Sequence, residues 1–303
     1  MSHDELITRI EELKKEKDAV ICAHYYVDEE VQKISDYVGD SFYLAKVAAN
    51  LKEQTIVFCG VSFMGESAKV LSPEKTILMP DPTADCPMAH MAMVSAIEKY
   101  RKHYDDLAVV CYVNSTAELK MHSDVCVTSS NALKIVRKLP NKNIFFIPDI
   151  NLGSYVKKMV PEKNIILNEG FCPVHKEIEA TDVETARVAH PNAKLLVHPE
   201  CSPDVIELAD YAGSTSEIIE YANQSECDEF IIGTEIGVFY ELKKRCPNKE
   251  FFPIKNNQIC KDMKKISLEK VYNALNTMSP TVELSDEEIS RAKSPLMKML
   301  ELA

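Results

Sequence analysis

Three cysteines recur at nearly equal intervals along this 303-residue chain: Cys86, Cys172 and Cys260 lie 86 and 88 residues apart. Each follows a short apolar run, and Cys86 and Cys172 are followed by proline. A thiolate is a strong metal ligand, but three are one fewer than a closed four-ligand site requires. On an iron–sulfur cube the missing ligand leaves one iron open, and an open iron is a Lewis acid that can bind a substrate oxygen. The spacing therefore predicts a metal centre on these three residues.

Other polar residues repeat with the same period. His24, Tyr112 and His198 each follow an apolar, strand-like run. A hydroxyl residue lies 17 positions after each of them, and these residues are Ser41, Ser129 and Thr215. We expect a helix to begin at each hydroxyl, and helix starts attract anions through exposed N–H groups and the helix dipole. Three such starts around one cavity would hold a substrate with two or three negative groups.

Side chains that could move or orient a proton gather at the same strand ends. They are His24, Tyr26, Tyr112, Asn114, His175, His198 and Glu200. A histidine or carboxylate beside a metal-bound leaving group is suited to carry its proton. Cys201 with His198 and Glu200 offers an alternative zinc site, although no second histidine lies at helical or hairpin spacing. We interpret the other cysteines as structural residues of strands or helices: Cys22, Cys59, Cys111, Cys126, Cys227 and Cys246.

Between these landmarks the chain alternates between strand and helix patterns. An amphipathic helix is expected to open each copy of the repeat, at 6–15, 94–103 and 183–190. Twelve residues after each strand end an aspartate leads into a short strand, at Asp36, Asp124 and Asp210. A further helix is expected to begin near each of Gly65, Gly153 and Gly237. Ser115 with Glu118 is typical of a capping box, and Ser202 followed by Pro203 is typical of a helix start.

Alternating helices and strands indicate parallel sheets that are covered on both faces. The predicted fold class is therefore α/β, with three homologous three-layer αβα units that each contain a short parallel sheet. We expect these units at 1–88, 89–174 and 175–260. Ligands of such sheets bind beyond the carboxyl ends of the strands, so units arranged around a pseudo-threefold axis would share a central active site. The remaining segment, 261–303, is expected to be helical and to pack on the first unit.

The overall composition limits the kinds of partner. A net charge of −12 argues against nucleic acid, because binding to phosphates needs clustered Lys and Arg. No run approaches the roughly 20 apolar residues of a membrane span, and the charged N-terminus does not resemble a signal peptide. The ten cysteines include no Cys-x-x-Cys pair. They point to a reducing compartment, so we expect a cytoplasmic protein with no membrane and no nucleic-acid partner.

Eight segments, in order and covering nearly the whole chain, resemble quinolinate synthase. They are Ala23-His24-Tyr25-Tyr26, Val38-Gly39-Asp40-Ser41, Cys86-Pro87-Met88-Ala89, Tyr112-Val113-Asn114-Ser115-Thr116, Cys172-Pro173-Val174-His175, Val197-His198-Pro199-Glu200-Cys201, Gly213-Ser214-Thr215 and Ile232-Gly233-Thr234-Glu235-Ile236-Gly237. The resemblance implies a [4Fe–4S] cluster on three cysteines with one open iron. It also implies condensation of iminosuccinate with dihydroxyacetone phosphate to quinolinate, with loss of phosphate and two waters, in de novo NAD biosynthesis. An aspartate oxidase or dehydrogenase would then supply the iminosuccinate.

The resemblance also assigns roles to residues of this sequence. It implies that Cys86, Cys172 and Cys260 bind the cluster, and that Tyr26 and Glu200 act as the acid–base pair with His24. It places the following residues against the substrate: His24, Ser41, Tyr112, Asn114, Ser129, His175, His198, Glu200 and Thr215. The chain departs from the family pattern in two places. Tyr25 stands where asparagine is usual, and Cys260 stands alone where some members carry three spaced cysteines, so we expect no disulfide switch.

Other functions remain open at this stage. Diphthamide-forming radical enzymes and isoprenoid diphosphate reductases also place three cysteines in three units, but the His-x-Tyr and His-Pro-Glu strand ends speak against both classes. A cluster-based metabolite sensor without turnover would need an output domain or a partner surface. The sequence contains neither a basic patch nor a spare domain.

Overall fold

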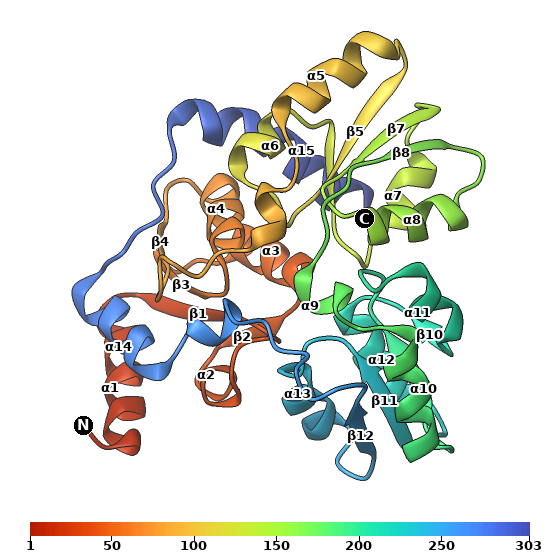
Figure 1. The fold of residues 1–303 in the computed structure, drawn as a ribbon. Coiled ribbons are helices and arrows are strands. Elements are labelled where there is room, and N and C mark those ends of the chain that lie inside the picture. Colours follow the sequence, from red (N-terminus) through yellow and green to blue (C-terminus); the bar gives the residue numbers. More distant parts are fainter.

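The computed structural model describes residues 1–303 and contains three four-stranded parallel sheets with one shared strand order (Figure 1). The first sheet has the order β2-β1-β3-β4, with β1 (Ala19–His24), β2 (Tyr37–Gly39), β3 (Thr55–Cys59) and β4 (Thr76–Leu78). The second has the order β6-β5-β7-β8, with β5 (Leu107–Tyr112), β6 (Val125–Val127), β7 (Asn143–Ile147) and β8 (Asn164–Leu167). The third has the order β10-β9-β11-β12, with β9 (Lys194–Val197), β10 (Tyr211–Ala212), β11 (Glu229–Gly233) and β12 (Glu250–Pro253).

Helices connect the strands and cover the sheets. The first unit contains α1 (His3–Glu16), α2 (Glu29–Lys33), α3 (Ser41–Asn50) and α4 (Ser62–Leu71). The second contains η1 (Pro87–His90), α5 (Val94–His103), α6 (Ala117–Met121), α7 (Ala132–Lys138) and α8 (Ile150–Met159). The third contains α9 (Pro173–Lys176), α10 (Ala180–Ala189), α11 (Pro203–Leu208), α12 (Thr215–Gln224) and α13 (Val238–Arg245). The chain ends with η2 (Met263–Lys265), α14 (Leu268–Thr277) and α15 (Asp286–Leu302). No helix is long and apolar enough to cross a membrane.

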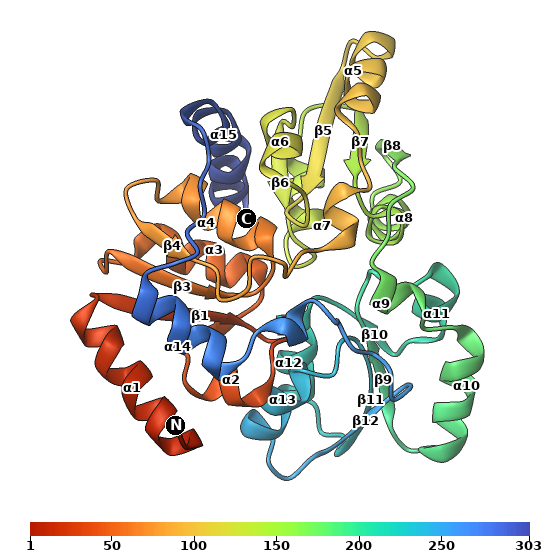
Figure 2. The same cartoon turned by 60° about the vertical axis from the view of Figure 1, so that its left-hand side comes forward.

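The central strands show why this arrangement forms. Every side chain of β1 and of β5 is buried, on both faces of its sheet. Strands that are apolar on both faces require a helical layer on each side, and parallel pairing with helical crossovers supplies it. The predicted α/β class with three repeated αβα units is therefore confirmed, and Figure 2 shows the units as three lobes around a common centre.

The hydrophobic core is shared unequally among the three units. One cluster of 63 buried residues runs through the first two sheets and the C-terminal helices. The third unit has two smaller clusters of its own. Tyr25, although it follows β1 of the first unit, is buried in a cluster of the third unit. Its side chain therefore joins the two units and does not line the central site.

The two C-terminal helices have different neighbours. Helix α14 packs on α1 and β3 of the first unit, as expected for 261–303. Helix α15 contacts α4 of the first unit but also α6, β6 and α7 of the second. Its buried face, formed by Ala292, Leu296 and Met299, lies between the two units. The expectation that the whole segment packs on the first unit was thus too narrow, because an amphipathic pattern predicts a buried face and not its neighbour.

Two predicted helix starts were misplaced by three residues. Helices α4 and α8 begin at Ser62 and Ile150, so Gly65 and Gly153 lie inside their first turns. A Cβ at Gly65 would approach Met79 Sδ to 2.5 Å, and one at Gly153 would approach Leu167 Cδ2 to 2.7 Å. These glycines therefore permit close packing and do not mark helix starts.

Two other local predictions were also wrong. Helix α7 begins at Ala132, so Ser129 lies in the preceding turn and does not open a helix. Helix α6 is capped by Thr116, whose hydroxyl accepts from Leu119 N–H, so the capping box at Ser115 does not form. Adjacent Ser and Thr residues are equally good caps by type, and the sequence alone could not choose between them. The start at Ser202 and Pro203 is confirmed.

The repeated aspartates have a structural role. Each stands before the second strand of its unit and accepts a hydrogen bond from a backbone N–H of the first strand. The bonds join Asp36 to Ile21 at 2.8 Å, Asp124 to Val109 at 2.7 Å and Asp210 to Leu195 at 2.7 Å. A cation pairs with each carboxylate, namely Lys14, Arg101 and Arg187. These bonds fix the register of the two strands, and the three aspartates do not line the central site.

Candidate active site

A cavity of about 560 Å³ lies where the carboxyl ends of the strands of all three sheets meet. Every residue that the sequence suggested for the site lines it. These are His24, Tyr26, Ser41, Cys86, Tyr112, Asn114, Ser129, Cys172, His175, His198, Glu200, Thr215 and Cys260. They come from three units that are far apart in the sequence, and parallel strands bring them together because their carboxyl ends share one edge.

The three cysteines occupy similar places. Cys86 and Cys172 stand immediately before η1 and α9, and the proline that follows each is the first residue of the short helix. Cys260 lies three residues before the first residue of η2. Burial raises the pKa of all three thiols, and the negative charge of Cys260 would raise that of Cys86 further. Thiols with raised pKa values stay protonated on their own. A bound metal cation would deprotonate them, because its charge stabilises the thiolate.

The three cysteines reach one cavity from three different parts of the chain. A closed structural metal site commonly uses four protein ligands, so three thiols alone would leave one coordination position of a metal centre open.

Glu200 is the most highly connected polar residue of the site. Its Oε1 accepts a 2.5 Å hydrogen bond from the Tyr112 phenol, and its Oε2 lies 2.8 Å from His175 Nδ1. Burial alone would raise the pKa of Glu200, but His198, His175 and the Tyr112 hydroxyl outweigh it and lower the pKa to about 2. The carboxylate is therefore ionised in the buried site.

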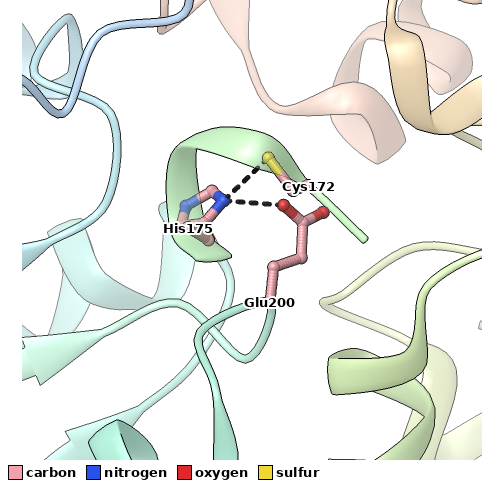
Figure 3. A group of neighbouring side chains, drawn as sticks. All are labelled: Cys172, His175 and Glu200. Carbon is pink, nitrogen blue, oxygen red and sulfur yellow. Dashed lines mark hydrogen bonds and ion pairs between the residues drawn. The ribbon is translucent and has the colours of Figure 1, made fainter. Parts of the chain in front are cut away.

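His175 lies between this carboxylate and one of the cysteines, as Figure 3 shows. Its Nδ1 is 3.2 Å from Cys172 Sγ, and its Nε2 is 2.9 Å from Thr234 Oγ1. The ligand atoms of Cys172, His175 and Glu200 lie within 4.8 Å of one another. The predicted alternative zinc site on Cys201 was wrong, because Cys201 is fully buried and its Sγ faces Gly233 O.

Thr234 was not identified from the sequence. Its hydroxyl is 2.7 Å from the Tyr26 phenol, which is also 2.7 Å from Thr215 Oγ1. Thr234 also contacts His175, which in turn contacts Glu200, so Thr234 connects Tyr26 with that carboxylate through His175. The repeat could not reveal it, because the matching positions, Gly60 and Pro148, carry no hydroxyl. The one sequence signal for Thr234 is that it lies within the segment Ile232–Gly237, which resembles the family.

His24 and His198 adopt the same local conformation in the first and third units. In each case Nδ1 accepts a 3.2 Å hydrogen bond from the backbone N–H two residues later, at Tyr26 and at Glu200. Burial lowers the pKa of both imidazoles to about 3, although Glu200 acts in the opposite direction. Both rings are therefore neutral, with the proton on Nε2. For His198 that nitrogen lies 3.2 Å from Ser129 Oγ.

The predicted hydroxyls differ in their settings. Ser41 and Thr215 are the first residues of α3 and α12. Each directly follows the N-cap residue of its helix, so both lie at helix starts as predicted. Ser129 offers only its own hydroxyl from the turn before α7. Asp40 Oδ2 accepts a 2.6 Å hydrogen bond from Ser216, which ties the two helix starts together. Two of the three expected helix-start sites therefore face the cavity.

The other cysteines lie away from these groups. Cys22, Cys59, Cys111 and Cys126 are buried strand residues, as interpreted from the sequence. Cys246 caps the end of α13, and Cys227 lies in the loop before β11, so the interpretation of Cys227 as a strand or helix residue was wrong. None of these side chains lines the central cavity.

A cavity with three thiols, neutral imidazoles and the ionised Glu200 carboxylate among its lining groups, built at the strand ends of a triplicated α/β fold, defines an enzyme site of the metal-binding kind. A family model described as quinolinate synthetase A protein matches residues 8–301. Quinolinate synthase of Caldicellulosiruptor saccharolyticus is 52% identical over the full length of both chains, and that of Caldicellulosiruptor bescii is 54% identical over the full length of both. The Fusobacterium nucleatum enzyme is 54% identical over 97% of this chain and 98% of its own length.

The chain therefore belongs to the quinolinate synthase family, and it is an enzyme. The alternatives considered from the sequence were two other classes of iron–sulfur enzyme and a sensor without turnover. Membership of this family over nearly every residue sets all three aside.

Proposed function

We propose that this enzyme condenses iminosuccinate with dihydroxyacetone phosphate to quinolinate, with loss of phosphate and two waters, as a step of de novo NAD biosynthesis. One observation carries the proposal. All thirteen residues suggested from the sequence line one cavity in a chain that matches named quinolinate synthases along its whole length. A sequence repeat alone could not bring them together, because they come from all three units.

Cys86, Cys172 and Cys260 would hold a [4Fe–4S] cluster. When bound by three cysteines, such a cluster supplies a Lewis-acid iron that helps a substrate hydroxyl to leave as water. The fit rests on the donor set, since three half-buried thiols from different parts of the chain face one cavity. No other residue type around the cavity offers three soft ligands.

Both proposed substrates are anions, and the cavity presents hydroxyl, imidazole and amide donors together with the side chain of Lys261. Ser41, Ser129 and Thr215 would donate hydroxyl hydrogen bonds to the carboxylates and the phosphate, with the starts of α3 and α12 behind two of them. Neutral His24 and His198 each present an Nε2–H donor. Asn114 faces the cavity too, and its buried Oδ1 has no partner within the protein, which leaves an acceptor for the substrate.

Proton movement would fall to Tyr26 and Glu200. Burial and the nearby Glu200 carboxylate raise the pKa of the Tyr26 phenol well above its ordinary value, so Tyr26 would begin as the acid. Glu200 is ionised and would begin as the base, with Tyr112 and His175 orienting its two oxygens. Acid and base would thus be held ready on two different units, which is what general acid–base catalysis requires.

The proposal is tested by anaerobic purification followed by three measurements on one sample: iron, inorganic sulfide, and quinolinate formed from iminosuccinate and dihydroxyacetone phosphate. We expect about four irons and four sulfides per chain, as for one [4Fe–4S] cluster. Alanine at Cys86, Cys172 or Cys260 should abolish both cluster and product. The matched control is Cys227→Ala, because Cys227 lies outside the cavity. Wild-type protein that contains iron but forms no quinolinate would overturn the reaction, and wild-type protein without iron would overturn the cofactor.

Three further expectations belong to the same proposal. The chain would divide into units at 1–88, 89–174 and 175–260, and the existence of three separate sheets supports such a division. The enzyme works in the cytoplasm, where its ten free cysteines remain reduced. An aspartate oxidase or dehydrogenase supplies the iminosuccinate, because the imine is lost quickly in water and must be made nearby.

A further inference from the structure

The backbone N–H of each site cysteine donates a hydrogen bond to a carboxylate. Cys86 donates to Asp85 Oδ1 at 2.8 Å, Cys172 to Asp149 Oδ2 at 3.2 Å, and Cys260 to Glu235 Oε1 at 3.2 Å. A carboxylate is a stronger acceptor than a carbonyl, so bonds of this kind restrain a loop firmly. The same contact thus occurs three times, once at each point where the chain delivers a thiol to the cavity.

Each carboxylate is also fixed to the start of the helix that follows the third strand of its unit. Asp149 Oδ1 accepts from Leu152 N–H at 2.6 Å and caps α8, while Glu235 Oε2 accepts from Gly237 N–H at 2.6 Å just before α13. In the first unit the Ser62 hydroxyl, at the first residue of α4, donates to Asp85 Oδ1. The carboxylates therefore join the loop that carries the thiol to the rigid body of the unit.

The repeat does not explain the first of these contacts. Asp149 and Glu235 stand at matching places, after β7 and after β11. The matching place in the first unit is occupied by Val61, which has no carboxylate, and the carboxylate comes instead from Asp85, the neighbour of the cysteine itself. The three cysteine N–H groups thus bond to carboxylates that stand at two different kinds of position in the repeat. The repeat alone does not account for this, which indicates that the bond itself has a role.

Burial adds to the case. Asp149 and Glu235 are fully buried, and removing a carboxylate from water is costly unless hydrogen bonds satisfy both oxygens. In each of the two, one carboxylate oxygen accepts from a backbone N–H at the helix start and the other accepts from the cysteine N–H. Lys264, 3.3 Å from Glu235 Oε1, also donates to Tyr26 O at 2.8 Å and so ties the Cys260 segment to the first unit.

We propose that Asp85, Asp149 and Glu235 are positioning residues that hold the three cysteine loops in the geometry that accepts the cluster. The inference rests on the proposed function, since it assumes a cluster on these cysteines. Groups that orient metal ligands from behind commonly change metal affinity by roughly 10- to 100-fold when they are removed. Glu235 also lines the cavity, whereas Asp85 and Asp149 do not, and the role proposed for all three is exerted through the cysteines.

The way the oxygens are used makes the test specific. At Asp85, Oδ1 accepts from both Ser62 and Cys86, while Oδ2 lies 2.7 Å from the exposed His90 Nε2. Asp85→Asn keeps the oxygen that serves Ser62 and Cys86 and turns its NH₂ group towards His90, whereas Asp85→Ala removes all three contacts. At Glu235 the two contacts use different oxygens, so Glu235→Gln replaces one acceptor by an NH₂ group and must lose one of them. The amide substitution should therefore be tolerated at position 85 and harmful at position 235.

The experiment measures iron and sulfide per chain after anaerobic purification, and then the rate at which an iron chelator removes the iron. We expect Asp85→Ala and Glu235→Gln to release iron at least about 10-fold faster than the wild type, the lower end for groups behind a metal ligand. Asp85→Asn should behave as the wild type. Asp124→Ala is the control, because Asp124 makes the same kind of bond to a strand N–H outside the cavity.

The outcomes separate the two hypotheses. Wild-type protein that holds no iron removes the proposed cofactor and this inference with it. A normal cluster in the wild type together with normal retention in Asp85→Ala overturns the positioning role alone. Should Glu235→Gln fail to fold, the two substitutions at position 85 still decide, because Asp85 is partly exposed and its loop needs no repacking. Equal iron loss in Asp85→Asn and Asp85→Ala would also contradict the inference.

Discussion

The phenol of Tyr112 donates a 2.5 Å hydrogen bond to Oε1 of Glu200, across the boundary between the second and third units. Both residues stand at the ends of strands, Tyr112 as the last residue of β5 and Glu200 shortly after β9. The bond fixes the direction of the one carboxylate that several other groups also contact. Correct docking of the two units is therefore needed for the proposed base to point at the substrate.

Replacing Tyr112 by phenylalanine tests this bond. A hydrogen bond to a charged group is worth about 1.5–3 kcal/mol, so we expect kcat/KM for quinolinate formation to fall roughly 10- to 100-fold. Iron content should not change. Tyr100→Phe removes a hydroxyl from a ring that packs on Phe145, away from the cavity, and serves as the control. Equal activity of the two variants would show that the contact has no role in the reaction.

A second prediction concerns the hydroxyl of Thr234. It joins the Tyr26 phenol to His175, so Thr234→Val should leave His175 Nε2 without a partner at a buried position and leave the phenol with Thr215 alone. Leaving such groups unsatisfied costs about 1–3 kcal/mol, and we expect kcat to fall about 10-fold or more while KM changes less. Thr234→Ser keeps the hydroxyl and should restore most of the activity. Steady-state kinetics of both variants provide the measurement, and failure of serine to rescue would assign the effect to packing.

The proposed acid and base can be examined separately. General acid–base groups commonly contribute 10²- to 10⁴-fold, so Tyr26→Phe and Glu200→Gln should each lower kcat by about that much. Single-turnover assays with the anaerobic protein would show whether the chemical step itself is slowed. Near-normal turnover in both variants would remove these residues from the proton transfers.

The sequence was most informative where its repeat and its chemistry coincide. The strand ends at His24 and Tyr112 and the cysteines at 86, 172 and 260 predicted both the sheets and the shared edge, because each landmark recurs with one period. Features that occur once were missed. Thr234 has no counterpart hydroxyl in the other units, and the carboxylate at Asp85 replaces one that the repeat would place elsewhere.

Neighbours between units could not be predicted either. The apolar face of α15 was recognisable as a helix that must be buried, but its position between α4 and α6 depends on how the first two units dock. Tyr25 likewise has no pattern that would direct it into the third unit. Such contacts are tertiary, and local propensity and periodicity say nothing about them.

A pH-dependent contribution to stability is expected at Asp81. Burial alone would raise its pKa, but hydrogen bonds from Lys270 and Thr83 outweigh burial and lower the pKa to about 2. An aspartate in the unfolded chain has a pKa of about 3.9. The lower pKa of Asp81 in the folded protein therefore stabilises the fold fully above pH ~4, and this contribution is lost as the pH falls towards 2. Urea unfolding of metal-free wild type and Asp81→Asn at several pH values measures it. The difference in unfolding free energy should be largest near neutral pH and shrink on acidification; a constant difference would contradict the assignment.

The last helix should be essential for stability. Leu296 is fully buried where α15 packs against the first two units. Removing so much buried side chain costs about 2–5 kcal/mol, so Leu296→Ala should lower the urea midpoint by a corresponding amount. Met297→Ala, which changes a side chain exposed on the same helix, is the matched control. A similar loss in both variants would contradict the assignment to packing between the units, because alanine is the better helix former at either position.

The distribution of the thiols over three sheets also constrains how the protein can mature. A chain still emerging from the ribosome lacks its third sulfur donor until Cys260 has been made, and α15 follows still later. If the cofactor is bound as proposed, a chain that lacks Cys260 could coordinate it through Cys86 and Cys172 only. On this proposal, binding by all three thiols would require a chain that extends beyond Cys260 and three units that have docked.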